Sequence, residues 1–431
     1  MAYITSMTED YKIGIIGLGY VGFPLACLLA TKYTVTGYDI NPLRVEEINR
    51  GEDCTLEVES GKIADALRRG MVCTCDKEAL RGCNVYIVTV PTPITRHNVP
   101  DLSPLESASR LIGSLLSPGD TVVYESTVYP GLTETFCAPI LETVSGMKLN
   151  EGFFIGYSPE RVNPGDKEHP VERIVKITSG STPEAADRID LIYNSVLQNG
   201  THRAPSIKVA EAAKVVENAQ RDVNIAFMNE IAKIMDVLGV DTNDVLQAAG
   251  SKWNFLPFRP GLVGGHCIGV DPYYLIEEAR LHGVTPSLLI ETRRINAAMG
   301  SYVAERVVCL MNKQGLTAKN AQILILGFSF KENCPDIRNT RIVDIISTLR
   351  EYTPHITVLD PWVDPAEVRA EYGLDVCNRP EAINGHRYDA IILGVAHDCF
   401  RSLPLSGMTR PGGIIYDVKG MLDRELVTKR L

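Results

Sequence analysis

The stretch between Lys12 and Asp39 constrains the fold more than any other part of the sequence. An apolar run, Lys12–Ile16, leads into a glycine-rich turn with the pattern GxGxxG, and an apolar segment of helical character follows. A second apolar run then ends in Asp39. Strand, glycine turn, helix, strand and acid in this order are typical of dinucleotide-binding domains, in which the turn brings a pyrophosphate to the helix N-terminus. The turn residues expected to contact the cofactor are Gly17, Gly19, Tyr20, Val21 and Gly22.

Asp39 predicts which dinucleotide binds. A carboxylate at the end of the second strand accepts hydrogen bonds from ribose hydroxyls and repels a 2′-phosphate, so NAD is favoured over NADP. Arg44 follows five residues later. It could contact a phosphate or be an ordinary solvated helix residue, and the sequence favours neither.

Three further strands follow in the same α/β order, and each ends in a polar loop. The predicted strands are 85–90, 121–124 and 153–157. Loops at the carboxyl ends of parallel strands face the ligand crevice. Thr92 and Thr127 are therefore candidates to face the nicotinamide half of NAD, although ordinary turn chemistry explains Thr92 equally well. Glu160 lies at the exit of the third strand, where it could be catalytic or structural.

The middle of the chain changes to helical periodicity. Over Ile207–Leu238, apolar residues recur at spacings of three and four without Gly or Pro, which predicts one long helix and a candidate dimer contact. Lys214 and Asn218 lie one turn apart on one face of it, and Arg221 lies near that face. These side chains could form a solvated face or a tucked, functional pair. A second helical run is expected over 288–312.

A second α/β half begins near residue 321. Its predicted strands are 322–327, 356–360, 389–394 and 413–417. The turn after the first strand lacks GxGxxG, which suggests a different nucleotide, with Lys331 and Arg338 bringing positive charge to its phosphates. Because 431 residues exceed one ordinary domain, we expect an α/β fold with two Rossmann-like parallel-sheet domains joined by a helical middle domain with a long central helix. The predicted domain boundaries are 1–205, 206–312 and 313–431.

A single thiol lies in a box rich in glycine and proline, Arg259–Tyr274, which contains Gly264-Gly-His-Cys267. Asp271-Pro272 has the pattern of a helix start. Amides and the helix dipole near such a start favour a thiolate, which is the reactive form of cysteine. Cys267 is thus a candidate nucleophile, and a buried structural cysteine is the alternative. No other His or Cys clusters with His266 and Cys267 in the sequence, so no metal is expected.

The bulk composition excludes several classes of protein. A net charge of −10 without a basic run argues against a nucleic acid partner. No uncharged apolar stretch approaches the about 18 residues of a membrane-spanning helix, and residues 1–11 lack a secretory pattern. The eleven cysteines are scattered, without zinc or disulfide spacing. We therefore expect a cytoplasmic protein without a membrane or nucleic acid partner.

The motifs of this chain resemble those of the UDP-sugar 6-dehydrogenases over nearly its whole length. GLGYVG, the STV of 126–128, the SPER of 158–161, the Lys214/Asn218 helix, GGHCIGVDPYYL and FSFKENCPDIRNT occur in the order of that family, and the GGHC…DP box is the most specific. The resemblance implies an NAD-binding domain, a helical dimerising domain and a UDP-binding domain, which oxidise the C6 alcohol of a UDP-sugar to a carboxylate with two NAD. It implies these substrate-binding residues: Glu160, Arg161, Lys214, Asn218, Arg221, Phe255, Arg259, Gly261, Gly264, Lys331 and Arg338.

Within the family, this chain is similar to the acetamido-sugar branch. GGHC, where other members have GGSC or GGYC, and the FKENCPDIRNT run resemble enzymes that oxidise UDP-N-acetylglucosamine or UDP-N-acetylgalactosamine for capsule and O-antigen sugars. UDP-N-acetylmannosamine is the near alternative. Pro164 stands where the glucose branch has a second acid, so UDP-glucose is disfavoured.

The implied mechanism consists of two oxidations and a hydrolysis. Lys214 or a water takes the C6 hydroxyl proton, Cys267 attacks the aldehyde to give a thiohemiacetal, and the second oxidation leaves a thioester for water to hydrolyse. Lys214 and Asn218 would stabilise the C6 oxyanion. Asp271 would orient water or act as a base, with a plain N-cap as the alternative. Glu160 would serve the hydrolysis. Thr127 completes the expected catalytic set.

Two other classes of function remain open from the sequence. A two-electron β-hydroxyacid dehydrogenase is similar to this chain in having a Rossmann domain followed by a helical domain with a Lys/Asn helix. Such an enzyme would form one NADH per substrate. A non-catalytic nucleotide-sugar-binding protein would form none.

Overall fold

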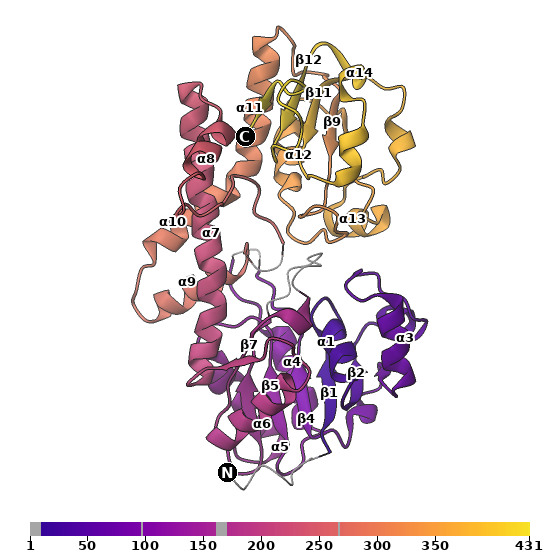
Figure 1. The fold of residues 1–431 in the computed structure, drawn as a ribbon, viewed down its shortest axis with the longest axis vertical. Coiled ribbons are helices and arrows are strands. Elements are labelled where there is room, and N and C mark those ends of the chain that lie inside the picture. Colours follow the sequence, from indigo (N-terminus) through magenta and orange to yellow (C-terminus); the bar gives the residue numbers. More distant parts are fainter. Residues whose placement is uncertain (1–9, 96–97, 161–169, 266–267) are drawn as a thin grey trace. The chain divides into compact units, whose positions relative to one another are not determined.

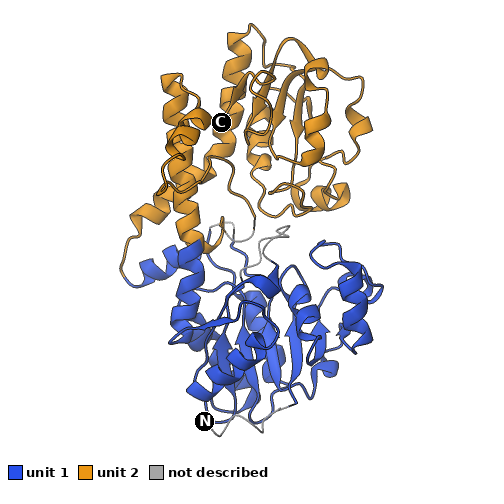
Figure 2. Cartoon of the chain, in the orientation of Figure 1, with its two compact units in different colours: residues 1–217, 273–282 blue, residues 218–272, 283–431 orange. Residues whose placement is uncertain are grey.

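The computed structural model of the chain describes residues 10–95, 98–160, 170–265 and 268–431. It contains two compact units, residues 1–217 with 273–282 and residues 218–272 with 283–431 (Figure 2). The division into domains at 205 and 312 stays a prediction. None of the helices in these described ranges is long and apolar enough to cross a membrane.

The first unit is built on a six-stranded parallel sheet with the order β3-β2-β1-β4-β5-β6 (Figure 1). The strands are β1 (Lys12–Ile16), β2 (Thr34–Tyr38), β3 (Val72–Thr74), β4 (Val85–Val88), β5 (Thr121–Tyr124) and β6 (Phe154–Tyr157). This is the order of a dinucleotide-binding fold, and the order in which strands are added to the sheet reverses between β1 and β4. The loops that follow β1 and β4 therefore border the ligand crevice of this unit.

Both faces of this sheet are covered, because successive strand residues enter opposite apolar clusters. Ile87 of β4 and Val123 of β5 belong to one cluster, whereas Tyr86 and Tyr124 belong to the other. This alternation is the two-residue period of a strand, and burial on both faces is typical of parallel sheets. The helices of the unit are α1 (Gly22–Leu29), α2 (Pro42–Asn49), α3 (Ser60–Arg68), α4 (Ser103–Gly113), α5 (Ala138–Ser145) and α6 (Pro183–Asn194). A separate pair of short strands, β7 (Lys176–Thr178) and β8 (Thr201–Arg203), was not expected from the sequence.

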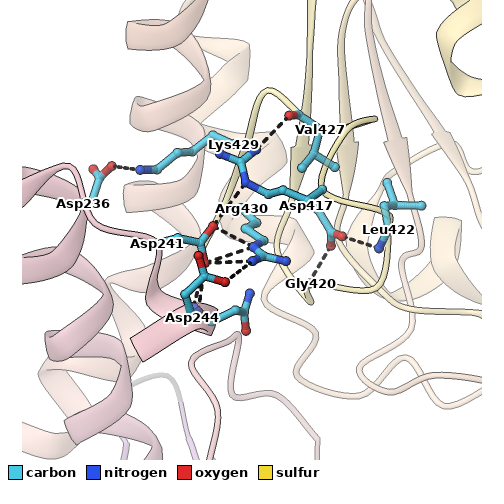
Figure 3. Close-up of polar contacts among 11 residues, drawn as sticks. Asp236, Asp241, Asp244, Asp417, Gly420, Leu422, Val427, Lys429 and Arg430 are labelled. Atoms are coloured by element: carbon cyan, nitrogen blue, oxygen red, sulfur yellow. Dashed lines mark hydrogen bonds and ion pairs between the residues drawn. The ribbon is translucent and has the colours of Figure 1, made fainter. Parts of the chain in front are cut away.

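The second unit carries a five-stranded parallel sheet with the order β10-β9-β11-β12-β13. Its strands are β9 (Ile323–Leu326), β10 (Ile356–Leu359), β11 (Tyr388–Leu393), β12 (Thr409–Asp417) and β13 (Lys429–Arg430). Here the order reverses between β9 and β11, so the loops after these two strands border a second crevice. Ion pairs hold the short last strand within the unit. Arg430 donates to both carboxylate oxygens of Asp241, and Lys429 lies 2.9 Å from Asp236 (Figure 3).

The long helix expected from the sequence is confirmed as α7 (Ile207–Leu238), which contributes its first turns to the first unit and the remainder to the second. The helical run expected over 288–312 is confirmed, and a break at Ala298 divides it into two helices, α10 (Ser287–Ala297) and α11 (Met299–Lys313). Ala298 between them keeps helix-like angles (φ −79°, ψ −6°), so the hydrophobic period does not reveal the break. The other helices are α8 (Thr242–Ala249), α9 (Asp271–Leu281), α12 (Ile342–Arg350), α13 (Pro365–Tyr372) and α14 (Leu405–Met408).

Candidate active site

The turn after β1 has the geometry of a pyrophosphate cradle. Gly17 adopts φ +99°, and a Cβ on Gly22 would lie 1.9 Å from the carbonyl oxygen of Gly17, so the first and third glycines allow the tight turn into α1. Gly19 is exposed, and a Cβ placed there would meet nothing within 4 Å. Its backbone is thus open to a ligand beside the N-terminus of α1, as phosphate binding at a helix start requires. Tyr20 and Val21 complete this open turn, and both are half-buried.

Asp39 is fixed against the same turn. Its Oδ2 accepts from the amide of Leu18 at 2.8 Å, and its Oδ1 accepts from the amide of Asn41 at 2.8 Å. A carboxylate offers about four acceptor positions, so two remain for the hydroxyls of a ribose. The residues of this crevice fit NAD.

The environment of Arg44 differs from both sequence hypotheses, which were a phosphate contact and a solvated helix position. Its side chain is buried, with 7% of its surface exposed, so the solvated alternative is wrong. Nε donates to the carbonyl oxygen of Leu18 at 2.8 Å, and the guanidinium pairs with Asp53 at 2.8 Å and Glu47 at 3.0 Å. Two acids therefore balance its charge, and Arg44 braces the glycine turn from within the protein.

The loops after β4 and β5 are tied to each other. Ser126 Oγ donates to the carbonyl oxygen of Val90 at 2.7 Å, and Tyr157 donates to the carbonyl oxygen of Ser126 at 3.1 Å. Thr92 and Thr127 lie in these loops and are both buried. They come from the strand ends that border the crevice, as the sequence predicts, and their contact with nicotinamide stays a prediction.

Lys214 and Glu160 come together in the first unit. Lys214 is 5% exposed, and its Nζ donates to the carbonyl oxygen of Glu160 at 3.0 Å, so the solvated-face alternative is wrong for this lysine. The Glu160 carboxylate is also buried and lies 3.5 Å from the ammonium of Lys176. Lys176 pairs in turn with Glu125 at 2.8 Å. The sequence reasoning missed Lys176 and Glu125, because residues 51 apart in the chain leave no local pattern.

Asn218 and Asp271 form a second buried pair, in the second unit. Asn218 Nδ2 donates to Asp271 Oδ2 at 2.5 Å, and Arg221 donates to Asn218 Oδ1 at 3.5 Å. Asp271 opens α9, so the helix start expected at Asp271-Pro272 is confirmed. Asp271 is the first residue of the helix instead of the expected cap before it, and its carboxylate accepts from Asn218 of α7.

The glycine box is anchored on both sides of its thiol position. Asn229 of α7 clamps Gly261 through two hydrogen bonds, to its carbonyl oxygen at 3.0 Å and from its amide at 2.8 Å. The amide of Gly265 donates to the carbonyl oxygen of Arg338 at 3.1 Å. Arg293 donates to the carbonyl oxygen of Gly269 at 3.0 Å, and Asp222 pairs with that arginine.

For several of the predicted site residues, the structure does not test the predicted contact with substrate. His266, Cys267, Arg161 and Pro164 lie outside the described residues. Arg259 is exposed and Phe255 is half-buried. A Cβ on Gly264 would lie 2.8 Å from the carbonyl oxygen of Asn339, so Gly264 packs closely against the segment after β9.

A small hollow lies at the crevice of the second sheet, next to this packing. It is lined by Leu262, Gly264, Ser329, Phe330, Thr340, Arg341, Ile342, Gly394, Val395 and Lys419. Arg338 is instead held by Asp336, with Nε 2.9 Å and 3.1 Å from the two carboxylate oxygens. Lys331, half-buried, does not line the hollow. The sequence reasoning missed Arg341 and Lys419 in its wall, where Arg341 pairs with Asp344 at 3.2 Å and Lys419 lies 3.8 Å from Glu332. No group of three His, Cys, Asp or Glu side chains in the described ranges could hold a metal ion.

Three models of one family match successive parts of the chain. They are the NAD binding domain of the UDP-glucose/GDP-mannose dehydrogenase family over residues 11–197, its central domain over 208–298 and its UDP binding domain over 324–424.

Individual relatives match over the full length. A UDP-N-acetyl-D-glucosamine 6-dehydrogenase of Pseudomonas aeruginosa is 50% identical over 426 residues, which cover 98% of this chain and 100% of the relative. A protein of the same name from Salmonella typhi is also 50% identical, over 98% of this chain and 99% of its own. The solved structure of a UDP-D-ManNAc dehydrogenase from Pyrococcus horikoshii has a TM-score of 0.88 and 29% identity, and covers 97% of this chain and 98% of its own.

Proposed function

This chain belongs to the UDP-glucose/GDP-mannose dehydrogenase family, and on that premise we propose that it oxidises C6 of UDP-N-acetylglucosamine to the uronate. The fold class, the NAD cofactor and the class of nucleotide-sugar dehydrogenase expected from the motifs are confirmed. The observation that carries the choice of sugar is the 50% identity, over 98% of the chain, with two UDP-N-acetyl-D-glucosamine 6-dehydrogenases. UDP-N-acetylgalactosamine is the second candidate. The uronate would enter a surface polysaccharide such as capsule or O-antigen.

NAD, when bound, accepts the hydride in each of the two oxidations. The open backbone at Gly19 and the start of α1 would hold its pyrophosphate, and Asp39 would bind its ribose hydroxyls. Thr92 and Thr127 would line the nicotinamide end. Arg44 would act through the turn that it braces.

The nucleotide end of the sugar substrate would lie in the crevice of the second sheet. Arg341 and Lys419 line the hollow there and suit a diphosphate, and Phe330 offers an aromatic face. We propose that the substrate is also held by the following residues: Arg161, Arg221, Phe255, Arg259, Gly261, Lys331 and Arg338.

The chemistry at C6 would use the buried polar groups described above. Lys214, directly or through a water, takes the proton of the C6 hydroxyl, and Lys214 with Asn218 stabilises the oxyanion. The Cys267 thiolate adds to the aldehyde carbon and retains it as a thiohemiacetal, which the second oxidation converts to a thioester. Asp271 and Glu160 serve proton transfer, with Glu160 assigned to the hydrolysis that frees the uronate and the thiol.

We also propose that the protein forms a homodimer or a higher homo-oligomer through α7. The exposed apolar side chains of α7 are Val209, Val216, Phe227, Ile234 and Leu238, with Val237 beside them. The first five recur after 7, 11, 7 and 4 residues, each close to a whole number of helical turns at about 3.6 residues per turn. They therefore form one stripe, and covering such a stripe with a second copy removes it from water. Phe227→Glu should lower the molar mass measured by light scattering.

We propose a cytoplasmic location, where NAD, nucleotide sugars and reduced thiols occur together. Cysteines within the described ranges are free thiols, as that compartment maintains them.

The proposed reaction is tested by counting NADH. Purified protein with NAD is incubated separately with UDP-N-acetylglucosamine, UDP-N-acetylgalactosamine, UDP-N-acetylmannosamine and UDP-glucose, and NADH is counted per sugar consumed. Two NADH with UDP-N-acetylglucosamine as the preferred sugar is the expected result. Preference for another of the four keeps the class and replaces the substrate. One NADH per substrate would indicate the β-hydroxyacid class, and none with tight UDP-sugar binding would indicate a binding protein.

A further inference from the structure

Glu125 and Lys176 form a buried ion pair for which the proposed reaction has no role. Both side chains are 0% exposed, and Lys176 Nζ lies 2.8 Å from Glu125 Oε2. Tyr193 donates a hydrogen bond to the other carboxylate oxygen of Glu125, and its ring lies 5.1 Å from the ammonium. Apolar residues of similar volume stabilise an interior at least as well as a buried ion pair does. Stability alone is therefore a weak reason for these two charges.

The ammonium of Lys176 is shared between two carboxylates. Besides Glu125, it lies 3.5 Å from Glu160 Oε2 and donates to the carbonyl oxygen of Pro159 at 3.3 Å. Lys214 donates to the next carbonyl, that of Glu160, at 3.0 Å. Lys176 and Lys214 thus donate hydrogen bonds to the carbonyl oxygens of two successive residues, and Lys176 also lies near the carboxylate of Glu160.

The buried groups around Glu160 carry charges of both signs, and these charges shift the pKa values of Glu125 and Lys176. Burial raises the pKa of Glu125 to about 7, although the attraction of Lys176 opposes this, and repulsion from Glu160 adds to it. Burial lowers the pKa of Lys176, but the two carboxylates outweigh that effect, so the pKa is raised and the ammonium persists at neutral pH. The groups that face Glu160 from the neighbouring elements are therefore the Lys176 ammonium, the Glu125 carboxyl, whose pKa burial raises, the Lys214 ammonium and the Tyr193 hydroxyl.

We propose that Lys176 is a positioning residue that keeps the Glu160 carboxylate ionised and oriented to activate water in the hydrolysis of the acyl-enzyme, and that Glu125 holds the Lys176 ammonium in place. This rests on the proposed function, in which that hydrolysis completes the reaction. Glu160 takes a proton from water, the water oxygen bonds to the acyl carbon, and the carbon–sulfur bond breaks so that Cys267 leaves as a thiolate. No electrons are transferred to an oxidant in this step. When Glu160 becomes neutral, Glu125 remains beside Lys176 as its counter-ion.

The test separates the oxidations from the hydrolysis. The variants are Lys176→Met, Glu125→Gln and the double variant, which removes both charges together and avoids leaving Glu125 as a buried carboxylate without its lysine. Thr178→Val is the matched control, because Thr178 is buried on the same strand but donates to Asp190 instead of the cluster. Each protein is mixed with excess NAD and UDP-N-acetylglucosamine. The NADH burst, the steady-state rate, its pH profile and the intact protein mass are then measured.

Lys176→Met and the double variant should form about two NADH per site in a burst and then turn over at least about tenfold more slowly, as loss of a general base requires. Their mass should increase by the sugar acyl group, and the acid limb of the rate profile should move to higher pH. Thr178→Val should keep the wild-type limb and accumulate no adduct. Glu125→Gln removes a negative charge that repels Glu160, so its acid limb should move to lower pH.

Two results would overturn the inference alone, given a wild type that forms two NADH per sugar. One is a double variant with wild-type hydrolysis and an unchanged pH profile. The other is an equal loss of burst and steady state without an adduct, which a structural role would produce. A wild type that forms one NADH or none removes the proposed function, and this inference with it.

Discussion

Lys214→Ala tests the proposed oxyanion site directly. Lys214 is 5% exposed and is held by the carbonyl oxygen of Glu160 at 3.0 Å, so its ammonium occupies one position and is shielded from solvent. A fixed donor in such a site stabilises a transition state more than it does in water. Loss of one oxyanion donor costs about 10² to 10³ in kcat, or about 2.7–4 kcal/mol. Because Lys214 is also a candidate base, we expect the rate to fall by at least the upper end of that range.

The assay is steady-state NADH formation at saturating NAD, with the concentration of the UDP-sugar varied. An interaction made only in the transition state lowers kcat and kcat/KM equally, so KM should change little. Lys208→Ala is the matched control, because Lys208 is an exposed lysine of the same helix, and it should keep wild-type rates. A loss of less than tenfold in Lys214→Ala, or a loss confined to KM, would refute the role and leave Lys214 as a residue that only holds the Glu160 backbone.

Three further changes probe the thiol, the cofactor cradle and the last strand. Cys267→Ala should abolish uronate formation, measured by chromatography, while NAD affinity by calorimetry stays unchanged; wild-type turnover would remove the covalent mechanism. Gly22→Ala should abolish measurable NAD binding, because its Cβ would lie 1.9 Å from the Gly17 carbonyl oxygen; wild-type affinity would contradict that geometry. Arg430→Ala should lower the thermal midpoint by about 5 °C at pH 7, from about 2 kcal/mol of charge-assisted hydrogen bonds to Asp241. Burial raises the pKa of Asp241, but Arg430 and nearby amides lower it by more than burial raises it, so the net shift of the pKa is downward. The stabilisation is thus fully present above the unfolded pKa of about 4, and the difference between variant and wild type should vanish as the pH falls through the lower pKa of the folded protein.

The sequence predicted those elements whose signal lies in consecutive residues. Strand β1 and helix α7 have the bounds expected from apolar runs and from a period without Gly or Pro. The strands that were missed, β3, β7, β8 and β13, have two or three residues each, which is too short for a period to appear. Their positions depend on the neighbouring strands that pair with them.

The site divides along the same line between local and distant information. The GxGxxG turn, the Asp39 strand end and the Asp271 helix start were predictable because each is a local pattern. The neighbours of the charged residues were not, because pairs such as Lys176 with Glu125 form only after the chain has folded. Arg338 is instructive here, since its partner Asp336 is only two residues away. An arginine with an acid two residues away is therefore a weak sequence signal for a phosphate site.

The two sheets use one turn geometry for different ligands, and the hydrogen bonds of two acids explain how. Gly17 and Gly327 both have positive φ, +99° and +93°, and the acid after the next strand, Asp39 or Asp360, accepts from the amide that follows the glycine. In the described residues Asp39 accepts two backbone hydrogen bonds. Asp360 accepts from three amides and lies 3.0 Å from the Nε2 of the buried His397. Since each carboxylate oxygen has about two acceptor positions, Asp39 retains one on each oxygen for a ribose diol, whereas Asp360 retains one on Oδ1 and none on Oδ2. A ribose diol, which needs two acceptor positions, is therefore recognised better at the first sheet than at the second. We expect one chain to bind one NAD at a time, and NADH to leave before the second NAD binds.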